Sequence, residues 1–225
     1  MGRRFETDRA QSRYIGLVTL PFSKAKFIYA HRGIWDISTP SNSKPALERA
    51  SIDGYSIETD IRLLGNKLVI HHDAEFSGEE VSLDTLNIGD SSVALNIKSD
   101  GLVSHVKSWL SGRLLDGTFV FDGSIPEMYK YSQHSIPHAL RLSEFESELP
   151  WMPSHIWLDA FTKDWWLSNQ KVLDTIKNNK VTIVSPELHG RDPRRVWDFI
   201  LGNINDFLDV SFCTDRPNDL WKLAQ

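Results

Sequence analysis

The sequence predicts a single-domain α/β protein whose architecture is a (β/α)8 barrel of the TIM type. Short apolar runs of strand length recur along the chain, helical patterns fill several of the gaps between them, and nearly every run ends in a polar side chain. Alternating strands and helices favour a parallel sheet. Eight such units in 225 residues fit a closed barrel, although barrels usually have ~250 residues. The alternative is an open doubly wound sheet, but no G-x-G-x-x-G motif follows the first strand.

Composition places the chain among ordinary globular proteins. Hydrophobic residues make up 40% of the chain and charged residues 24%, which argues against disorder. The net charge of −5 argues against a general nucleic-acid-binding surface, while leaving room for a local cationic pocket. Cys213 is the single cysteine, so no intramolecular disulfide can form. No apolar run approaches the ~20 residues of a membrane helix, and the N-terminal "YIGLVTL" is too short for a secretion signal, so we expect a cytoplasmic protein.

Strands are expected wherever an apolar run is bounded by turn residues. The eight barrel strands are predicted at Phe27–Ala30, Tyr55–Asp60, Val93–Ile97, Phe119–Asp122, Ala139–Leu142, Ile156–Asp159, Val181–Val184 and Val210–Cys213. A further strand at Lys67–His71 is expected to form a hairpin with the end of the run Tyr55–Leu63, because Gly65 and Asn66 suit a tight turn.

Helical patterns lie between these strands. In "DGLVSHVKSWL" the apolar residues fall on one helix face. In "SIPEM" we predict a capping box, in which Ser124 accepts a hydrogen bond from the backbone N–H of Glu127 and the Glu127 side chain reaches back to Ser124. "DPRRVWDFIL" and "DRPNDLWKL" place proline near a helix start. "RLSEFESEL" carries a less regular helical pattern before a short connection.

The barrel prediction also locates the chemistry, because the active sites of such barrels lie at the C-terminal ends of the strands. The polar side chains at these ends are His31, Arg32, Glu58, Asp60, His72, Asp73, Asn96, Lys98, Asp122, Arg141, Asp159, Glu187 and Asp215. A charged substrate in the barrel mouth would require such a ring of polar groups. In the second half of the chain, the candidate substrate contacts that follow strands are Arg141, Glu144, Asp159, Glu187 and His189.

Glu58 and Asp60 are two residues apart in "YSIETDIRL", so in a strand their side chains point to the same side. Two neighbouring carboxylates repel each other unless a cation lies between them, and Mg²⁺ and Ca²⁺ prefer such oxygen ligands. The alternative is a solvated pair of carboxylates on an edge strand.

His31 and His72 suit acid–base chemistry, because an imidazole titrates near neutral pH. Adjacent strand residues face opposite ways, so only one of His71 and His72 is expected to face the site. Arg32 and Lys98 suit the binding of phosphate oxygens, and the alternative is that they form ion pairs with neighbouring carboxylates.

The segments "HRG", "SNS" and "GYSIETDIRLLGNKLVIHHD" together resemble the glycerophosphodiester phosphodiesterase family, of the phosphatidylinositol-phospholipase-C-like phosphodiesterase superfamily. That family has His-Arg-Gly at the end of its first strand, followed by Pro-Glu-Asn-Thr, a Glu-x-Asp pair and a His-Asp after a further strand. The resemblance covers residues 27 to 73, and the later "LNIK" and "CTDRP" are similar to further elements of the family. It implies a (β/α)8 barrel, in agreement with the strand count.

The resemblance implies that His31 and His72 form the acid–base pair. It selects His72 because the matching histidine directly precedes an aspartate. It also implies that Glu58, Asp60 and the residue at position 96, here Asn96, hold one divalent cation, Mg or Ca.

Arg32 and Lys98 match the phosphate contacts of the family, and Arg141 is a further substrate-binding candidate because of its place after a strand. The single barrel domain is expected to span residues 1–225. Within it, residues 1–26 are expected to form an N-terminal extension, and residues 74–92 a small inserted segment that covers the site.

Two positions depart from the family pattern. Pro40-Ser41-Asn42-Ser43 stands where Pro-Glu-Asn-Thr is usual. Asn96 stands where a third metal-binding carboxylate is usual. An amide oxygen can coordinate Mg²⁺ or Ca²⁺, but the site loses one negative charge and should bind the metal more weakly.

The expected function is metal-dependent hydrolysis of a small-molecule glycerophosphodiester to an alcohol and a phosphomonoester, with no nucleic-acid partner and no membrane span. One alternative is a catalytically silent barrel that binds a phosphate ester. Another keeps the reaction but changes the diester to a lipid or a cell-envelope polymer unit, with the tryptophans of "WMPSHIW" and "DWW" as an apolar or sugar-stacking wall. Such tryptophans also commonly pack helices onto a barrel, and strand alternation predicts that Trp157 lies in the core. The oligomeric state is not predicted.

Overall fold

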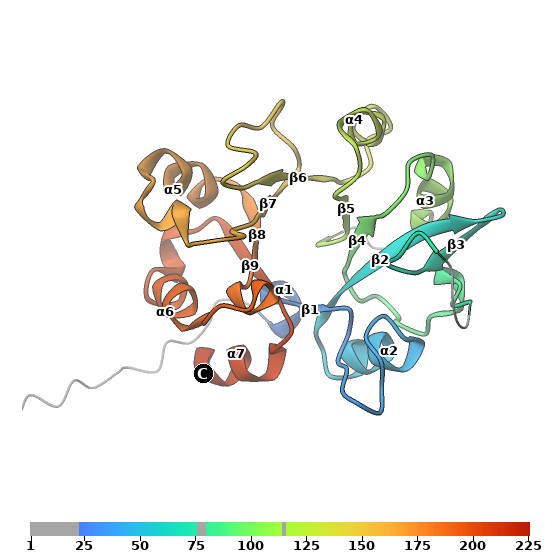
Figure 1. Cartoon of the computed structure of the whole chain (residues 1–225), viewed down its shortest axis with the longest axis horizontal. Coiled ribbons are helices and arrows are strands. Elements are labelled where there is room, and N and C mark those ends of the chain that lie inside the picture. The colour runs from blue at the N-terminus through green and yellow to red at the C-terminus, as the bar shows by residue number, and fades with distance from the viewer. Residues whose placement is uncertain (1–22, 76–79, 114–115) are drawn as a thin grey trace, which may run out of the picture.

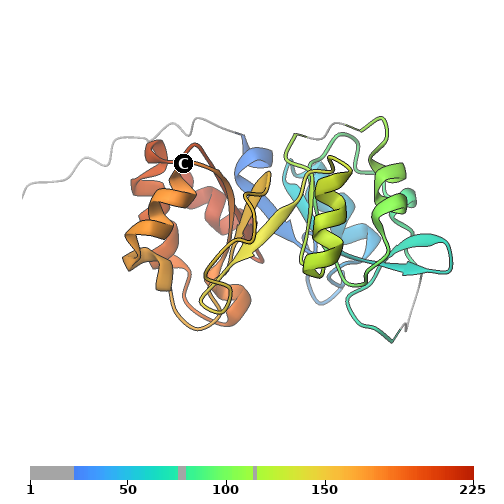
Figure 2. The same ribbon diagram turned by 90° about the horizontal axis from the view of Figure 1, so that it is seen from above.

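The computed structural model describes residues 23–75, 80–113 and 116–225, in which eight parallel strands curve into a nearly closed barrel with helices on its outside (Figure 1). The barrel strands are β1 (Ile28–His31), β2 (Ser56–Leu64), β4 (Val93–Ile97), β5 (Phe119–Phe121), β6 (Ala139–Leu142), β7 (His155–Leu158), β8 (Lys180–Val184) and β9 (Asp209–Thr214). Each of the eight predicted strands is therefore confirmed, β4 and β6 with the predicted bounds and the other six with shifted ends. The ninth, β3 (Lys67–Ile70), pairs antiparallel with β2, and this hairpin projects from the barrel (Figure 2).

The order of strands around the barrel is β5-β4-β2-β1-β9-β8-β7-β6. Between β5 and β6 the closure consists of a single parallel bridge between Val120 and His138, with the Val120 N–H donating to the Pro137 carbonyl at 3.0 Å. This seam is the weakest junction of the barrel among the described residues. The topology confirms the predicted barrel over the open doubly wound sheet.

Helices alternate with most of the strands. The α-helices of the described chain are α1 (Lys24–Phe27), α2 (Lys44–Ile52), α3 (Val103–Leu110), α4 (Ile125–Gln133), α5 (Gln170–Lys177), α6 (Arg194–Gly202) and α7 (Pro217–Ala224). Its short 3₁₀ helices are η1 (Leu83–Thr85), η2 (Trp165–Ser168), η3 (Pro186–His189) and η4 (Ile204–Asp206). None of the described helices has the length and apolarity that a membrane span requires.

The predicted extension and insertion are described only in part, since residues 1–22 and 76–79 lie outside the described ranges. The last residues of the extension form α1, and the insertion contains η1. The helical pattern in "RLSEFESEL" was misleading, because residues 143–150 form bends and turns instead. Ser143 and Glu146 bond to each other through their backbones in both directions, which closes a tight turn there.

Apolar side chains fill the barrel interior and the layer between strands and helices. The interior cluster consists of Tyr29, Ala94, Phe119, Phe121, Ala139, Trp157, Val184 and Cys213. Trp157 stacks on Phe121 with 3.9 Å between ring centroids, so it is a core residue as strand alternation predicts. Trp166 is also buried and meets Phe199 edge-on, so neither tryptophan is available to form a substrate-stacking wall.

The start of α4 confirms half of the predicted capping box. The Ser124 hydroxyl accepts a hydrogen bond from the Glu127 N–H at 3.3 Å, as expected. The Glu127 carboxylate, however, does not reach back. It accepts hydrogen bonds from the backbone N–H groups of Gly101 and Leu102, at 2.8 and 3.0 Å, and so caps the neighbouring helix α3. Glu127 is buried and links the two helices that flank β5.

Replacing Glu127 with alanine should lower the free energy of unfolding by about 2 kcal/mol, because it strips two backbone N–H groups of their acceptor. The measurement is urea unfolding followed by circular dichroism. Lys130→Ala is the matched control, since it removes the 3.2 Å ion pair of Glu127 but leaves the capping bonds in place. Lys130 is largely exposed, so the control should lose less than about 1 kcal/mol. Equal losses in the two variants would contradict the capping role.

Candidate active site

His31 ends β1 and lies between two carboxylates. Its Nδ1 is 2.7 Å from Oδ1 of Asp215, and its Nε2 is 3.9 Å from Oε2 of Glu58. Asp215 directly follows β9, and the parallel pairing of β1 with β9 brings the two residues together across most of the chain length. Burial lowers the pKa of His31, but the hydrogen bond with Asp215 and the charge of Glu58 outweigh it, so the net shift is upward.

The turn after His31 has an unusual backbone. Arg32 and Gly33 both have positive φ, 56° and 85°. This conformation directs the Arg32 N–H toward β2, where it donates to Oε2 of Glu58 at 3.1 Å and to the Glu58 carbonyl at 3.0 Å. A Cβ atom at Gly33 would lie 2.5 Å from the backbone carbon and oxygen of Ala46 in α2. The glycine of "HRG" is therefore required both by its φ and by the close approach of α2.

Asp60 is the most connected carboxylate of the mouth and has no solvent exposure. Oδ2 of Asp60 is 2.9 Å from Nε of Arg32, and Oδ1 is 3.3 Å from Nζ of Lys98. The Asn42 amide donates to Oδ2 at 2.7 Å, and its carbonyl accepts from the Thr59 hydroxyl. The structure thus brings Arg32 and Lys98 together on one carboxylate, so each forms the ion pair that was the alternative to phosphate binding.

The residues that were expected to hold a metal lie side by side. Glu58 and Asp60 are both buried on β2, and Asp60 is paired in register with Asn96 on β4. Oδ1 of Asn96 is buried and accepts no hydrogen bond within the described residues. Oδ1 of Asp60 is buried and accepts none there either, but it faces Nζ of Lys98 at 3.3 Å. Burial raises the pKa of Glu58, and the neighbouring Asp60 carboxylate raises it further.

These oxygen atoms fit a hard divalent cation, because two carboxylates and an amide oxygen are the ligand types that Mg²⁺ and Ca²⁺ prefer. The fit is limited to two acidic ligands. No group of three or more His, Cys, Asp or Glu side chains suited to a metal ion occurs in the described part of the chain. A site of this composition should bind a cation more weakly than one with three carboxylates.

His72 lies apart from this group, after β3 of the hairpin. Its side chain is 47% exposed, and Nδ1 is 2.7 Å from Oδ1 of the adjacent Asp73. No hydrogen bond or ion pair of the described residues joins His72 to Glu58 or Asp60. A cleft of about 1220 Å³ is lined by His72, His71 and Arg32. Its other lining residues are residues 38–45, Glu48, Ile70, Asp73, Glu80, Val81 and Thr85.

The opposite half of the mouth has a different charge pattern. Nη2 of Arg141 is 2.5 Å from Oδ1 of Asp122, and Nε of Arg141 is 3.6 Å from Glu146 and 4.0 Å from Asp159. Arg141 is thus surrounded by carboxylates rather than placed beside Arg32 and Lys98. Nε2 of His189 is 2.7 Å from Oδ1 of Asp159. The sequence indicated these residues only through their places after strands.

Glu187 in η3 was a candidate substrate contact, but it supports Asp215 instead. Its carboxylate accepts hydrogen bonds from the Thr214 hydroxyl and from the Asp215 N–H, the latter at 3.3 Å. Its other oxygen accepts from the Ser185 hydroxyl, which in turn accepts from the indole N–H of Trp197 at 2.8 Å. The sequence carried no signal for this chain of contacts, which holds Asp215 against His31.

No family model matches the sequence, and a search of curated proteins finds no match. Solved structures are similar in fold. A glycerophosphodiester phosphodiesterase from Agrobacterium tumefaciens matches with a TM-score of 0.61 and 16% identity, over 88% of this chain and 98% of that protein. A phosphodiesterase from Oleispira antarctica, in complex with the product sn-glycerol-3-phosphate, matches with a TM-score of 0.59 and 16% identity, over 87% of this chain and 95% of that protein. At this identity the likeness establishes the shared barrel fold.

Gly33→Ala should destabilise the protein by more than about 3 kcal/mol, because it adds the strain of a positive φ to a backbone clash with α2. Gly54→Ala is the matched control. Gly54 also has a positive φ, 81°, but a Cβ there meets no atom within 4 Å, so only the conformational cost of about 1 kcal/mol should remain. Urea unfolding of both variants measures the difference. A Gly33→Ala protein as stable as the control would contradict the close-packed turn.

Proposed function

We propose that this protein is a metal-dependent phosphodiesterase, which hydrolyses a small-molecule glycerophosphodiester to an alcohol and a phosphomonoester. The observation that carries the proposal is the convergence of five residues, which come from the end of β1, the interior of β2 and the end of β4. They are His31, Arg32, Glu58, Asp60 and Lys98. The fold that the chain shares with solved phosphodiesterases supports it, as does sn-glycerol-3-phosphate in one of those structures.

Arg32 and Lys98 supply two positive charges at the site where a phosphate would bind. In the free protein these charges are held against the buried Asp60. A divalent cation, Mg or Ca, held by Glu58, Asp60 and Asn96 would polarise a phosphoryl oxygen and lower the pKa of a substrate hydroxyl. The guanidinium and ammonium groups then bind the remaining phosphate oxygens, the first as a fork and the second as a point charge.

His31 and His72 move the protons. The hydroxyl next to the phosphate forms a new O–P bond, the P–O bond to the alcohol breaks, and a cyclic phosphate is left for water to open. One histidine accepts the proton of the attacking hydroxyl, and the other donates a proton to the departing alcohol. Asp215 orients the His31 ring through Nδ1, which directs Nε2 toward Glu58 and the substrate side. His72 borders the cleft that Arg32 also lines, and in this proposal it acts on the substrate from the hairpin side.

The second candidate is a barrel that binds a phosphate ester without turnover. Two observations favour it. Asn96 replaces a carboxylate among the expected metal ligands, and the half-exposed His72 has no hydrogen bond or ion pair to the described residues around Asp60. This function predicts binding of a phosphodiester that does not depend on metal and yields no product.

The deciding measurement is release of alcohol and phosphomonoester from a panel of glycerophosphodiesters, with Mg²⁺, with Ca²⁺ and with chelator. The wild-type protein should require a divalent cation, and His31→Ala should lower kcat by about 100-fold or more, since it removes a positioned acid–base group. His105→Ala, at a partly exposed position on α3, is the control and should keep full activity.

Circular dichroism of each variant excludes unfolding as the cause of a loss. Undiminished turnover in His31→Ala would rule out the assigned role of this residue. Binding without turnover under every metal condition would favour the silent barrel.

A further inference from the structure

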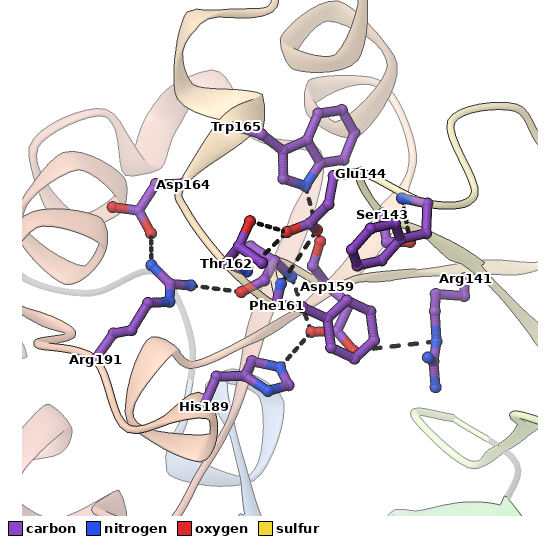
Figure 3. Close-up of polar contacts among 12 residues, drawn as sticks. Arg141, Ser143, Glu144, Asp159, Phe161, Thr162, Asp164, Trp165, His189 and Arg191 are labelled. Atoms are coloured by element: carbon purple, nitrogen blue, oxygen red, sulfur yellow. Dashed lines mark hydrogen bonds and ion pairs between the residues drawn. The ribbon is translucent and has the colours of Figure 1, made fainter.

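Asp159 and His189 form a second carboxylate–imidazole pair in the barrel mouth, on the side away from β2 and β4. Asp159 follows β7, and its side chain is only 5% exposed. Its Oδ1 accepts hydrogen bonds from Nε2 of His189 at 2.7 Å and from the N–H of Ala160 at 2.8 Å. Figure 3 shows His189 and Arg141 approaching this carboxylate from two sides.

The loop after β7 is held firmly by the side chains around it. The Glu144 carboxylate accepts hydrogen bonds from the backbone N–H groups of Phe161 and Thr162, at 3.1 and 2.7 Å, and from the Thr162 hydroxyl at 2.9 Å. Burial raises the pKa of Glu144, but these hydrogen bonds outweigh it and lower the pKa overall. Glu144 is therefore occupied as a loop anchor.

Two further side chains close the same loop. The indole N–H of Trp165 donates to the Asp159 carbonyl at 3.0 Å. Nη2 of Arg191 donates to the Ala160 carbonyl, and Nη1 to Asp164, both at 2.5 Å (Figure 3). The loop therefore presents Asp159 and Phe161 in one fixed arrangement, as a preorganised binding site requires.

His189 has one ring nitrogen left for a ligand. Nε2 is used by Asp159, while Nδ1 makes no hydrogen bond within the described residues. The imidazole packs against the Phe161 ring, with 4.8 Å between centroids, and its side chain is 22% exposed. The ring of Phe161 lies in turn 5.7 Å from that of Phe145, which is 72% exposed. A polar nitrogen thus stands at the edge of an apolar surface.

The charge around Arg141 excludes the phosphate from this side of the mouth. Its guanidinium is the cation nearest to Asp159, and it is already paired with Asp122 and faces Glu146. Three carboxylates therefore surround one guanidinium, and their excess negative charge repels an anionic phosphate. Arg32 and Lys98 lie at the ends of the other half. An uncharged part of the ligand is left for the His189 side.

We propose that His189 and Phe161, with Asp159 as the positioning residue, form the subsite for the alcohol portion of the diester and select an alcohol that carries free hydroxyl groups. This inference rests on the proposed function. A hydroxyl can donate to a neutral Nδ1 or accept from a protonated one, while its carbon chain lies against Phe161. An alkyl or trimethylammonium alcohol offers no hydrogen-bonding group to Nδ1.

The test measures binding by calorimetry in the His31→Ala protein, in which the diesters remain intact. The probes are the glycerol, ethyl and choline diesters of glycerol phosphate. The His31→Ala protein should bind the glycerol diester about 10-fold more tightly than the ethyl diester, since one more hydrogen bond is made. Adding His189→Phe should abolish this preference, and Asp159→Asn should weaken it.

His189→Asn is the conservative variant, which keeps a hydrogen-bonding group and should restore part of the preference that His189→Phe removes. His105→Asn is the control and should change nothing, because His105 lies on α3 outside the mouth. Thermal unfolding of each variant shows whether the fold is retained.

Three outcomes would overturn the inference. They are equal affinity for the glycerol and ethyl diesters, tightest binding of the choline diester, and absence of binding by all three probes. Turnover by the wild-type protein is measured separately. A preference for the glycerol diester without turnover would uphold the subsite and reject the phosphodiesterase function, whereas turnover without the preference would do the reverse.

Discussion

The arrangement of one half of the barrel mouth depends on the burial of the Asp60 carboxylate. A fully buried charge is costly unless cations and hydrogen-bond donors surround it. Here the compensating groups come from three separate parts of the chain: Arg32 from the turn after β1, Asn42 from the loop before α2, and Lys98 from the end of β4. The strand ends are thus tied together by one anion, in addition to the backbone ladders that join the strands.

The need to surround the Asp60 carboxylate also accounts for the backbone conformation of the turn after β1. Arg32 reaches Asp60 only because the turn after β1 takes two consecutive positive φ values, and the second of these falls on Gly33. The turn also brings the Arg32 N–H to Glu58, so one segment contacts both carboxylates of β2. The "HRG" segment is therefore a single packing unit in the structure. The positive φ of Gly33 allows the backbone turn from which Arg32 contacts Glu58 and Asp60.

Sequence patterns predicted those features of the fold that depend on residues close together in the chain. The strands follow from apolar runs, and the β2–β3 hairpin follows from Gly65 and Asn66, because both depend on neighbours within a few residues. The partner of Glu127 was mispredicted because its backbone partners lie immediately before another helix, α3, 25 and 26 residues away. The Asp215–His31 contact, which spans 184 residues, exists only through the pairing of β1 with β9, and no spacing in the sequence encodes it.

The two candidate functions differ in their need for a metal ion, and Asn96 is the residue that bears on this need. Arg32 and Lys98 both lie against Asp60, whereas burial raises the pKa of the neighbouring Glu58. A carboxylate at position 96 would add a further negative charge to this buried group, which a further cation would have to neutralise. The Asn96 amide adds no such charge, but its oxygen can still coordinate a metal ion. Both proposed functions have a phosphodiester bind at this site, so the metal requirement of turnover, rather than binding itself, distinguishes the proposed enzyme from the proposed silent barrel.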